Sequence, residues 1–345
     1  MGEINIRVEG RAGRITLTRP QALNALSYHM CRAISAALDE WRADPAVTLV
    51  VIDAEGARAF CAGGDVAEVW QASMSGDPGL GRAFWRDEYR MNAKLAEYPK
   101  PVVSLMQGFI MGGGVGLGCH VRHRVVAETA QVAMPESGIG LIPDVGGTLL
   151  LSRAPGRLGE YLGLTAARLG PDDAIHAGFA DHFIPQAEWP NLIDQLCATG
   201  DVGLLRVAAQ PVAKGELAQA AADLDAVMEG RDAAAVLAAL EVRGESWAVD
   251  GARAIRRNSP LSMAATLALL RGLPAGADIR QALQREYRFV WRAAEQGLTD
   301  FLEGVRAQII DKDRRPRWRH AAAGDVTAAE VEALLAPLGA EDLTF

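Results

Sequence analysis

The stretch Gly108–Gly147 constrains this chain more than any other, because it sets repeated glycines among apolar residues. A buried-strand pattern at 102–106 precedes it and leads into the glycine triplet at 112–114. The small residues at 115–119 then favour the start of a helix. A glycine turn that feeds a helix start leaves backbone N–H groups without intrahelical partners. Such groups can hold an anion or a developing oxyanion.

Two acidic residues, Glu136 and Asp144, follow in the same stretch, each beside a proline and close to glycines. Acidic side chains in tight, mostly apolar turns are uncommon unless they are paired or take part in chemistry. A desolvated glutamate has a raised pKa, which suits a base or a nucleophile near neutral pH. The residues alone leave two interpretations open, a catalytic anion-binding turn or ordinary glycine turns with solvated acids.

Composition excludes several classes of protein. Of the 345 residues, 50% are hydrophobic and 23% are charged, as in ordinary globular proteins, and the net charge of −8 argues against nucleic-acid binding. The cysteines form no CxxC pair, and His120 and His123 lack an evident third ligand, so no disulfide scaffold or metal site is predicted. Without a visible targeting segment or long apolar span, we expect a cytoplasmic protein that does not bind membranes.

Periodic patterns predict an α/β core. Alternating apolar and polar residues between 4 and 17 predict a pair of strands, and Ser27 is a plausible N-cap for a helix over 28–42. The run at 47–52 is almost wholly apolar, which is typical of a strand covered on both faces. Strand, turn and helix patterns repeat to about residue 185, which indicates α/β architecture with right-handed crossovers.

The composition changes after Pro185. Alanine and leucine dominate, strand patterns disappear, and the chain is predicted to be helical to its end. We therefore expect a core over residues 1–190 and a helical region over residues 191–345. Within the core, residues 75–98 predict a flexible loop that leads into an amphipathic helix.

Four separated segments resemble the crotonase (enoyl-CoA hydratase/isomerase) superfamily, whose members act on acyl-CoA thioesters. These segments are the turn at 59–65, the glycine segment at 111–117, the acidic segment at 134–147 and a distant segment at 303–318. The resemblance covers nearly the whole chain, from Arg19 to Trp318. It implies a spiral of repeated ββα units followed by a helical C-terminal region.

The resemblance also implies an oxyanion hole whose backbone N–H donors are Gly64 and Gly113. Glycine suits both positions because a ligand can approach its backbone closely, and each donor is worth roughly 3–4 kcal/mol in the transition state. Ala62 and Asp65 belong to the Cys-Ala-Gly-Gly-Asp turn, which in the family touches the acyl-CoA. The alternative interpretation of this turn is a tight loop that closes a strand.

By the same resemblance Glu136 is the catalytic acid that hydratases and hydrolases of the superfamily share. Asp144 separates the two activities, because similar hydratases usually carry glycine there and 3-hydroxyacyl-CoA hydrolases carry aspartate. Hydratases also carry a second glutamate at the place of Gly116, so its absence favours hydrolysis over hydration. Glu88 matches a glutamate that contacts substrate, although a solvated acid on a charged helix remains an open alternative.

The function that the resemblance implies is hydrolysis of a 3-hydroxyacyl-CoA thioester, with 3-hydroxyisobutyryl-CoA from valine breakdown as the expected substrate. Glu136 would attack the thioester or activate water, and Asp144 would bind the 3-hydroxyl or handle the proton. Coenzyme A enters as part of the substrate, and no metal or other cofactor is expected. An enoyl-CoA hydratase or isomerase and a non-catalytic acyl-CoA-binding protein remain alternatives. The assembly state is left open, a homo-oligomer included.

Overall fold

The computed structural model describes residues 2–345, and the chain forms two compact units that interleave along the sequence. The first unit comprises the chain up to Gly64 together with Arg90–Ala133 and Arg168–Gly215. The second unit comprises Asp65–Tyr89, Met134–Ala167 and Glu216–Phe345. The sequence analysis placed a domain boundary near residue 190, where the amino-acid composition changes. That boundary stays a prediction.

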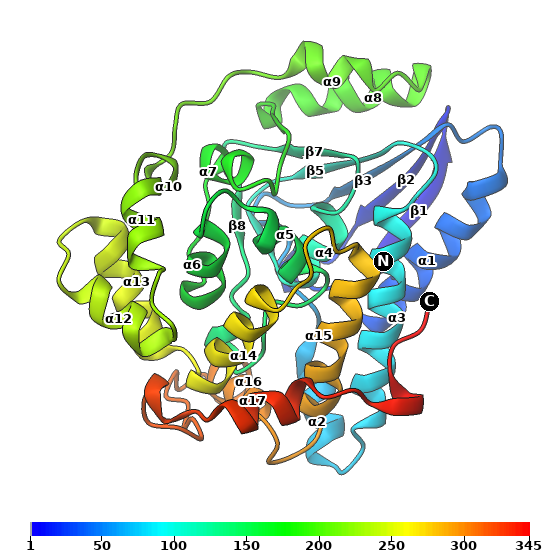
Figure 1. The fold of residues 1–345 in the computed structure, drawn as a ribbon. Helices are drawn as coiled ribbons and strands as arrows, with labels where there is room; N and C mark the ends of the chain where they lie inside the picture. Colours follow the sequence, from blue (N-terminus) through cyan, green and yellow to red (C-terminus); the bar gives the residue numbers. More distant parts are fainter. Residues whose placement is uncertain (1) are drawn as a thin grey trace. The chain divides into compact units, whose positions relative to one another are not determined.

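The first unit contains a six-stranded sheet with the strand order β1-β2-β3-β5-β7-β9 (Figure 1). β1 pairs antiparallel with β2, and each later neighbour pairs parallel. The strands are β1 (Ile4–Glu9), β2 (Ala12–Leu17), β3 (Leu49–Ala54), β5 (Val102–Met106), β7 (His123–Val126) and β9 (His182–Phe183). The predicted strands at 4–17, 47–52 and 102–106 are thereby confirmed to within two residues.

A second sheet of three parallel strands, in the order β4-β6-β8, carries the glycine turns of the first unit. Its strands are β4 (Ala59–Cys61), β6 (Phe109–Met111) and β8 (Gln131–Ala133). Because parallel neighbours end at the same edge of a sheet, the turns after β4 and β6 lie side by side. A Cβ added to Gly114 would lie 2.1 Å from the carbonyl oxygen of Cys61, so only glycine fits at this contact.

Helices cover the six-stranded sheet of the first unit. α1 begins after Ser27, whose hydroxyl accepts a hydrogen bond from the Met30 N–H at 3.2 Å, as the sequence predicts. α8 and α9 lie over one face of the sheet, where Leu192 and Leu196 join a buried apolar cluster with alternate strand residues such as Val51 (Figure 1). The helices and short 3-10 turns are η1 (Pro20–Ala22), α1 (Tyr28–Ala43), α4 (Gly113–Gly118), α7 (Pro171–His176), η3 (Gln186–Glu188), α8 (Trp189–Thr199) and α9 (Gly203–Ala208).

The second unit is helical. Among the described residues no strand follows β9, which confirms the predicted helical C-terminal region. None of the helices in residues 2–345 is long and apolar enough to cross a bilayer. α3 (Gly79–Ala96) passes from this unit into the first after Tyr89.

The helices of the second unit continue from α2 near its start to α17 near the C-terminus (Figure 1). They are α2 (Val66–Met74), α5 (Gly147–Arg153), α6 (Leu158–Thr165), α10 (Glu216–Gln219), α11 (Ala221–Val227), α12 (Ala233–Glu241), α13 (Ser246–Arg257), α14 (Pro260–Arg271), α15 (Ile279–Ala293), α16 (Phe301–Val305) and α17 (Ala328–Leu335). Short turns of 3-10 or π form are η2 (Glu136–Ile139), η4 (Arg306–Ile310), η5 (Ala323–Asp325) and η6 (Gly339–Glu341).

The acidic segment enters this helical unit through η2, which is held tightly by its neighbours. The Ser137 hydroxyl donates to the carbonyl oxygen of Gly163 at 2.8 Å, in α6. A Cβ added to Gly304, in α16, would lie 2.1 Å from the carbonyl oxygen of Ile139, so the two backbones are in direct contact. The path of the chain between Glu136 and α5 is therefore determined by packing against α6 and α16.

The contact between Gly114 and Cys61 yields a prediction about stability. Gly114→Ala should lower the free energy of unfolding by about 1–3 kcal/mol, because the added methyl group must displace backbone. Urea denaturation measures this loss. Gly244→Ala is the matched control, since a Cβ there meets nothing within 4 Å and should change stability by less than about 0.5 kcal/mol. Equal stability of both variants would contradict the contact.

Candidate active site

Four carboxyl groups of the second unit are buried together: Glu88, Glu136, Asp144 and Glu286 are exposed by 2%, 4%, 4% and 0%. They come from α3, from the start of η2, from the turn before α5 and from α15. Burial raises the pKa of each of the three glutamates, and negative charge on Asp144 adds to each rise, so the four groups lie close enough to interact. Among residues 2–345, no three His, Cys, Asp or Glu side chains are grouped so as to hold a metal ion. The structure thus brings the three sequence-predicted acids into one buried site.

Glu136 lies directly after Pro135, at the first position of η2. Burial, and then the negative charge of Asp144, raise the pKa of Glu136 well above its usual value. Its Oε2 atom is buried and has no hydrogen-bond partner among the described residues. A buried polar atom without a partner costs about 1–3 kcal/mol, and such atoms in native proteins commonly have a functional reason.

The carboxyl group of Asp144 accepts a hydrogen bond from a neighbouring side chain. The Tyr89 hydroxyl donates a hydrogen bond to its Oδ2 atom at 2.7 Å. Burial raises the pKa of Asp144 to about 7, while the hydrogen bond from Tyr89 and a backbone hydrogen bond oppose that rise. A carboxyl group with a pKa near neutrality can donate or accept a proton at physiological pH.

Glu88 is almost completely buried, which excludes the alternative of a solvated acid on a charged helix. Burial, and then the charge of Asp144, raise the pKa of Glu88 well above its usual value. Its Oε1 atom has no hydrogen-bond partner among the described residues. Substrate contact by Glu88 stays a prediction, and a buried, unpartnered oxygen is compatible with it.

The predicted oxyanion-hole residues lie in the first unit, in the turns that follow β4 and β6. The Ala62 N–H donates to the carbonyl oxygen of Leu23 at 3.1 Å and ties the first turn down. Within residues 2–345, the structure records no acceptor for the backbone N–H of Gly64 or Gly113, which is compatible with the predicted role. Asp65 is the first residue of the second unit and precedes α2.

Sequence reasoning missed two residues of the acid site, Tyr89 and Glu286. Glu286 carried a signal, because α15 presents an apolar face that includes Leu283 and Val290, and Glu286 is fully buried among those residues. A carboxyl group at an apolar helical position is unusual enough to indicate a site. Tyr89 gave no comparable signal, since a tyrosine beside charged residues is common on amphipathic helices.

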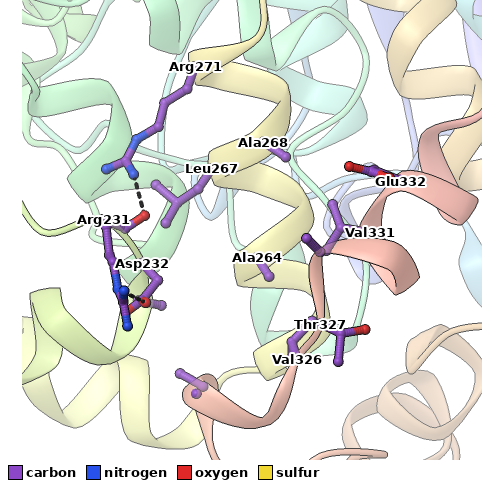
Figure 2. Close-up of a pocket in the computed structure, with 14 residues that line it drawn as sticks. Arg231, Asp232, Ala264, Leu267, Ala268, Arg271, Val326, Thr327, Val331 and Glu332 are labelled. Carbon is purple, nitrogen blue, oxygen red and sulfur yellow. Dashed lines mark hydrogen bonds and ion pairs between the residues drawn. The ribbon is translucent and has the colours of Figure 1, made fainter.

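A surface groove of about 330 Å³ in the second unit is separate from these acids (Figure 2). It opens between α14 and α17, and small apolar side chains such as Ala264 and Ala268 form much of its wall. The guanidinium of Arg271 is already engaged there, since it donates to the carbonyl oxygen of Arg231 at 2.6 Å and pairs with Glu160 at 2.6 Å. None of the predicted site residues lines this groove.

The α/β core, the buried acids and the glycine turns together define an enzyme of the crotonase class. A family model described as enoyl-CoA hydratase/isomerase matches residues 12–335, and the chain belongs to that family. The mitochondrial 3-hydroxyisobutyryl-CoA hydrolase of Rattus norvegicus is 37% identical over 99% of this chain and 91% of its own. 3-Hydroxyisobutyryl-CoA hydrolase 1 of Arabidopsis thaliana is 36% identical over 95% of this chain and 90% of its own.

Solved structures confirm the predicted fold. A crystal structure described as an enoyl-CoA hydratase from Rhodobacter sphaeroides 2.4.1 has a TM-score of 0.96 and 56% identity, covering 100% of both chains. One described as a carnitinyl-CoA dehydratase from Mycobacterium thermoresistibile has a TM-score of 0.94 and 39% identity, covering 100% of this chain and 99% of its own. Both similarities include the helical C-terminal region.

The raised pKa of Asp144 predicts how stability depends on pH. Because folding raises this pKa from an ordinary value near 4 to about 7, the native state holds an extra proton between those values. That stability is present below about pH 4 and is lost as the pH rises through 7. We expect Asp144 by itself to lower the free energy of unfolding by about 2–3 kcal/mol between pH 5 and pH 8, measured by urea denaturation as the difference between the wild type and Asp144→Asn.

Asp144→Asn should remove the part of this dependence that Asp144 contributes, because the amide does not ionise. The part due to Glu88, Glu136 and Glu286, whose pKa values burial also raises, should remain. Asp250→Asn is the matched control, since that side chain is 69% exposed and pairs with Arg253 at the surface. The control should keep the pH dependence of the wild type. A wild-type protein that gains stability from pH 5 to pH 8 would show that the acids are not buried as described.

Proposed function

We propose that this protein hydrolyses the thioester of 3-hydroxyisobutyryl-CoA, or of a close 3-hydroxyacyl-CoA, to the free acid and coenzyme A. The observation that carries the proposal is the buried pair of Glu136 and Asp144, in a chain 37% identical to a rat hydrolase of that name over 99% of its length. Valine breakdown is the expected metabolic setting.

The backbone N–H groups of Gly64 and Gly113 stabilise the oxyanion that forms on the thioester carbonyl. The absence of an acceptor for either N–H among the described residues, and the adjacency of the turns after β4 and β6, support this role. A pre-organised donor needs no reorientation when charge develops, which is why each is worth roughly 3–4 kcal/mol. Ala62 and Asp65 contact the coenzyme A portion of the substrate, and Glu88 contacts the acyl portion.

The carboxylate of Glu136 starts the cleavage of the thioester, either as the nucleophile or as the base. In one route it adds to the carbonyl carbon and expels the thiolate of coenzyme A, and water then hydrolyses the resulting anhydride. In the other route it removes a proton from water, which adds to the carbonyl directly. Both routes consume one water and return Glu136 to its starting state. Its raised pKa strengthens it as a nucleophile or a base.

Asp144 binds the 3-hydroxyl of the acyl group or handles the proton that the leaving sulfur requires. Its pKa of about 7 supports either task, because both protonation states are populated near neutral pH. The reaction needs no metal or redox cofactor in this proposal, and coenzyme A takes part only as a portion of the substrate. A cytoplasmic location stays a prediction, and the rat relative is named as mitochondrial.

Enoyl-CoA hydration is a second candidate, because a crystal structure 56% identical to this chain is described as an enoyl-CoA hydratase. Hydration in this superfamily is expected to use a second glutamate at the place of Gly116. That residue is buried within α4 and offers no carboxylate. The gain of Asp144 and the lack of an acid at Gly116 therefore favour hydrolysis.

The thiol that hydrolysis releases gives a direct test. Purified protein should release free thiol from 3-hydroxyisobutyryl-CoA, and Glu136→Gln should reduce kcat at least about 100-fold, since the amide neither attacks nor accepts the proton. Glu332→Gln is the matched control, because that side chain is exposed on α17, and it should retain full activity. No release by the wild type, or undiminished release by Glu136→Gln, would reject the proposal.

Crotonyl-CoA as the substrate distinguishes the proposed hydrolase from an enoyl-CoA hydratase and from a non-catalytic binding protein. A hydratase would remove the absorbance of its conjugated double bond without releasing thiol, whereas the proposed hydrolase should leave that absorbance unchanged over the same time. A non-catalytic binding protein would retain coenzyme A and turn over neither substrate. Either of those two results would replace the proposed function.

A further inference from the structure

Glu286 holds the backbone of the turn that carries Asp144. Its Oε2 atom accepts a hydrogen bond from the Gly146 N–H at 2.7 Å, and its Oε1 atom accepts one from the Thr148 N–H at 3.0 Å. The Thr148 hydroxyl also donates to Oε1. All these groups are buried, so water does not compete for the donors.

The turn needs such support because its backbone is strained. Val145 has a φ of 52° and Gly146 a φ of 80°, and the Gly147 N–H donates to the carbonyl oxygen of Asp144 at 2.6 Å. Positive φ at both central residues suits glycine and asparagine, whereas a β-branched valine there is an outlier. Strain of this kind persists only where surrounding contacts impose it. Glu286 imposes it by binding N–H groups of residues 146 and 148 with its two oxygens.

Tyr89 holds the side chain of the same aspartate. Its hydroxyl donates to Oδ2 of Asp144 at 2.7 Å, and its ring meets the ring of Tyr287 edge to face, with centroids 6.1 Å apart. Tyr287 follows Glu286 in α15, so a single helix supports the backbone of Asp144 directly and its carboxyl group through Tyr89. The sequence motifs that point to Asp144 contain none of α15.

We propose that Glu286 and Tyr89 are positioning residues for Asp144, which Glu286 orients through the turn at 144–148 and Tyr89 orients through the carboxyl group. The inference rests on the proposed function, because it assigns Asp144 a part in the reaction. Neither residue is assigned a contact with substrate. With Asp144 in its proton-handling role, their substitution should impair the chemical step more than substrate binding.

The pKa of Asp144 gives a second, independent test of the role of Tyr89. The titratable groups that face Asp144 are Glu88, Glu136, Glu286 and Tyr89. The carboxyl groups disfavour a further negative charge, whereas the Tyr89 hydroxyl stabilises the ionised form of Asp144. Removing that hydroxyl should raise the pKa of Asp144, and a limb of the pH–rate profile due to Asp144 should move to higher pH.

Glu286→Gln and Tyr89→Phe test the proposal with little change in side-chain volume. The glutamine keeps one carbonyl acceptor but turns an NH₂ group toward one of the two backbone donors. The turn therefore loses one of its two backbone hydrogen bonds to residue 286. We expect kcat for thiol release to fall about 10–100-fold in each variant, with KM changed less than threefold, because small misplacements of catalytic groups have effects of that size. In Tyr89→Phe the limb assigned to Asp144 should move to higher pH.

Glu295→Gln is the control, since this exposed acid lies just beyond α15, and its kinetics should match the wild type. A purely structural role for Glu286 and Tyr89 would lower the melting temperature and leave kcat per folded molecule and the pH profile unchanged. That outcome, or kcat within threefold of wild type in both variants, would overturn the proposal.

Titration of the Asp144 carboxyl group tests the inference without turnover. In protein with ¹³C-labelled aspartate, the Asp144 resonance is assigned by its loss in Asp144→Asn. Its midpoint should rise in Tyr89→Phe relative to wild type, and an unchanged midpoint would overturn the role of Tyr89. If the wild type releases no thiol, the proposed function fails, yet this titration still decides whether Tyr89 sets the state of Asp144.

Discussion

Mutual repulsion among buried carboxyl groups is the constraint on which the acid site depends. Moving an ionised carboxylate out of water costs several kcal/mol, and a second negative charge nearby adds to that cost. The protein compensates with neutral donors, namely the Tyr89 hydroxyl and the backbone N–H groups of Gly146 and Thr148. Burial and repulsion outweigh these donors, so the site holds protons near neutral pH, with the pKa of Asp144 at about 7 and that of Glu286 at about 8. A pKa near the working pH favours proton transfer in either direction.

Each of the two units carries one set of the predicted site residues. In the first unit, parallel pairing of β4 with β6 sets the two glycine turns side by side and leaves backbone donors without acceptors. In the second unit, helices enclose the acids and keep them from water. A glycine at position 116 and an aspartate at position 144 then favour hydrolysis over hydration on a framework shared with hydratases.

Sequence motifs were most informative where chemistry requires a particular residue type in a short segment. Glu136 and Asp144 stand out because acids are rare in apolar turns, and the structure buries both. The Ser27 cap is equally local, since an N-cap is recognised within one helical turn. Glu286 is different because it lies 140 residues from the Gly146 that it supports. No pattern near the acidic turn points to α15, and only chain folding brings them together.

Local sequence patterns were therefore sufficient to predict the succession of strands and helices along the chain, the glycine turns, two of the acids and the family resemblance. Periodicity and turn chemistry are properties of neighbouring residues, and they survive without knowledge of the fold. The folded chain alone established that Glu88 is buried, that Tyr89 hydrogen-bonds Asp144 and that Glu286 restrains a strained turn. Burial and the resulting pKa values depend on segments packed from distant parts of the sequence, so they appear only when those segments meet.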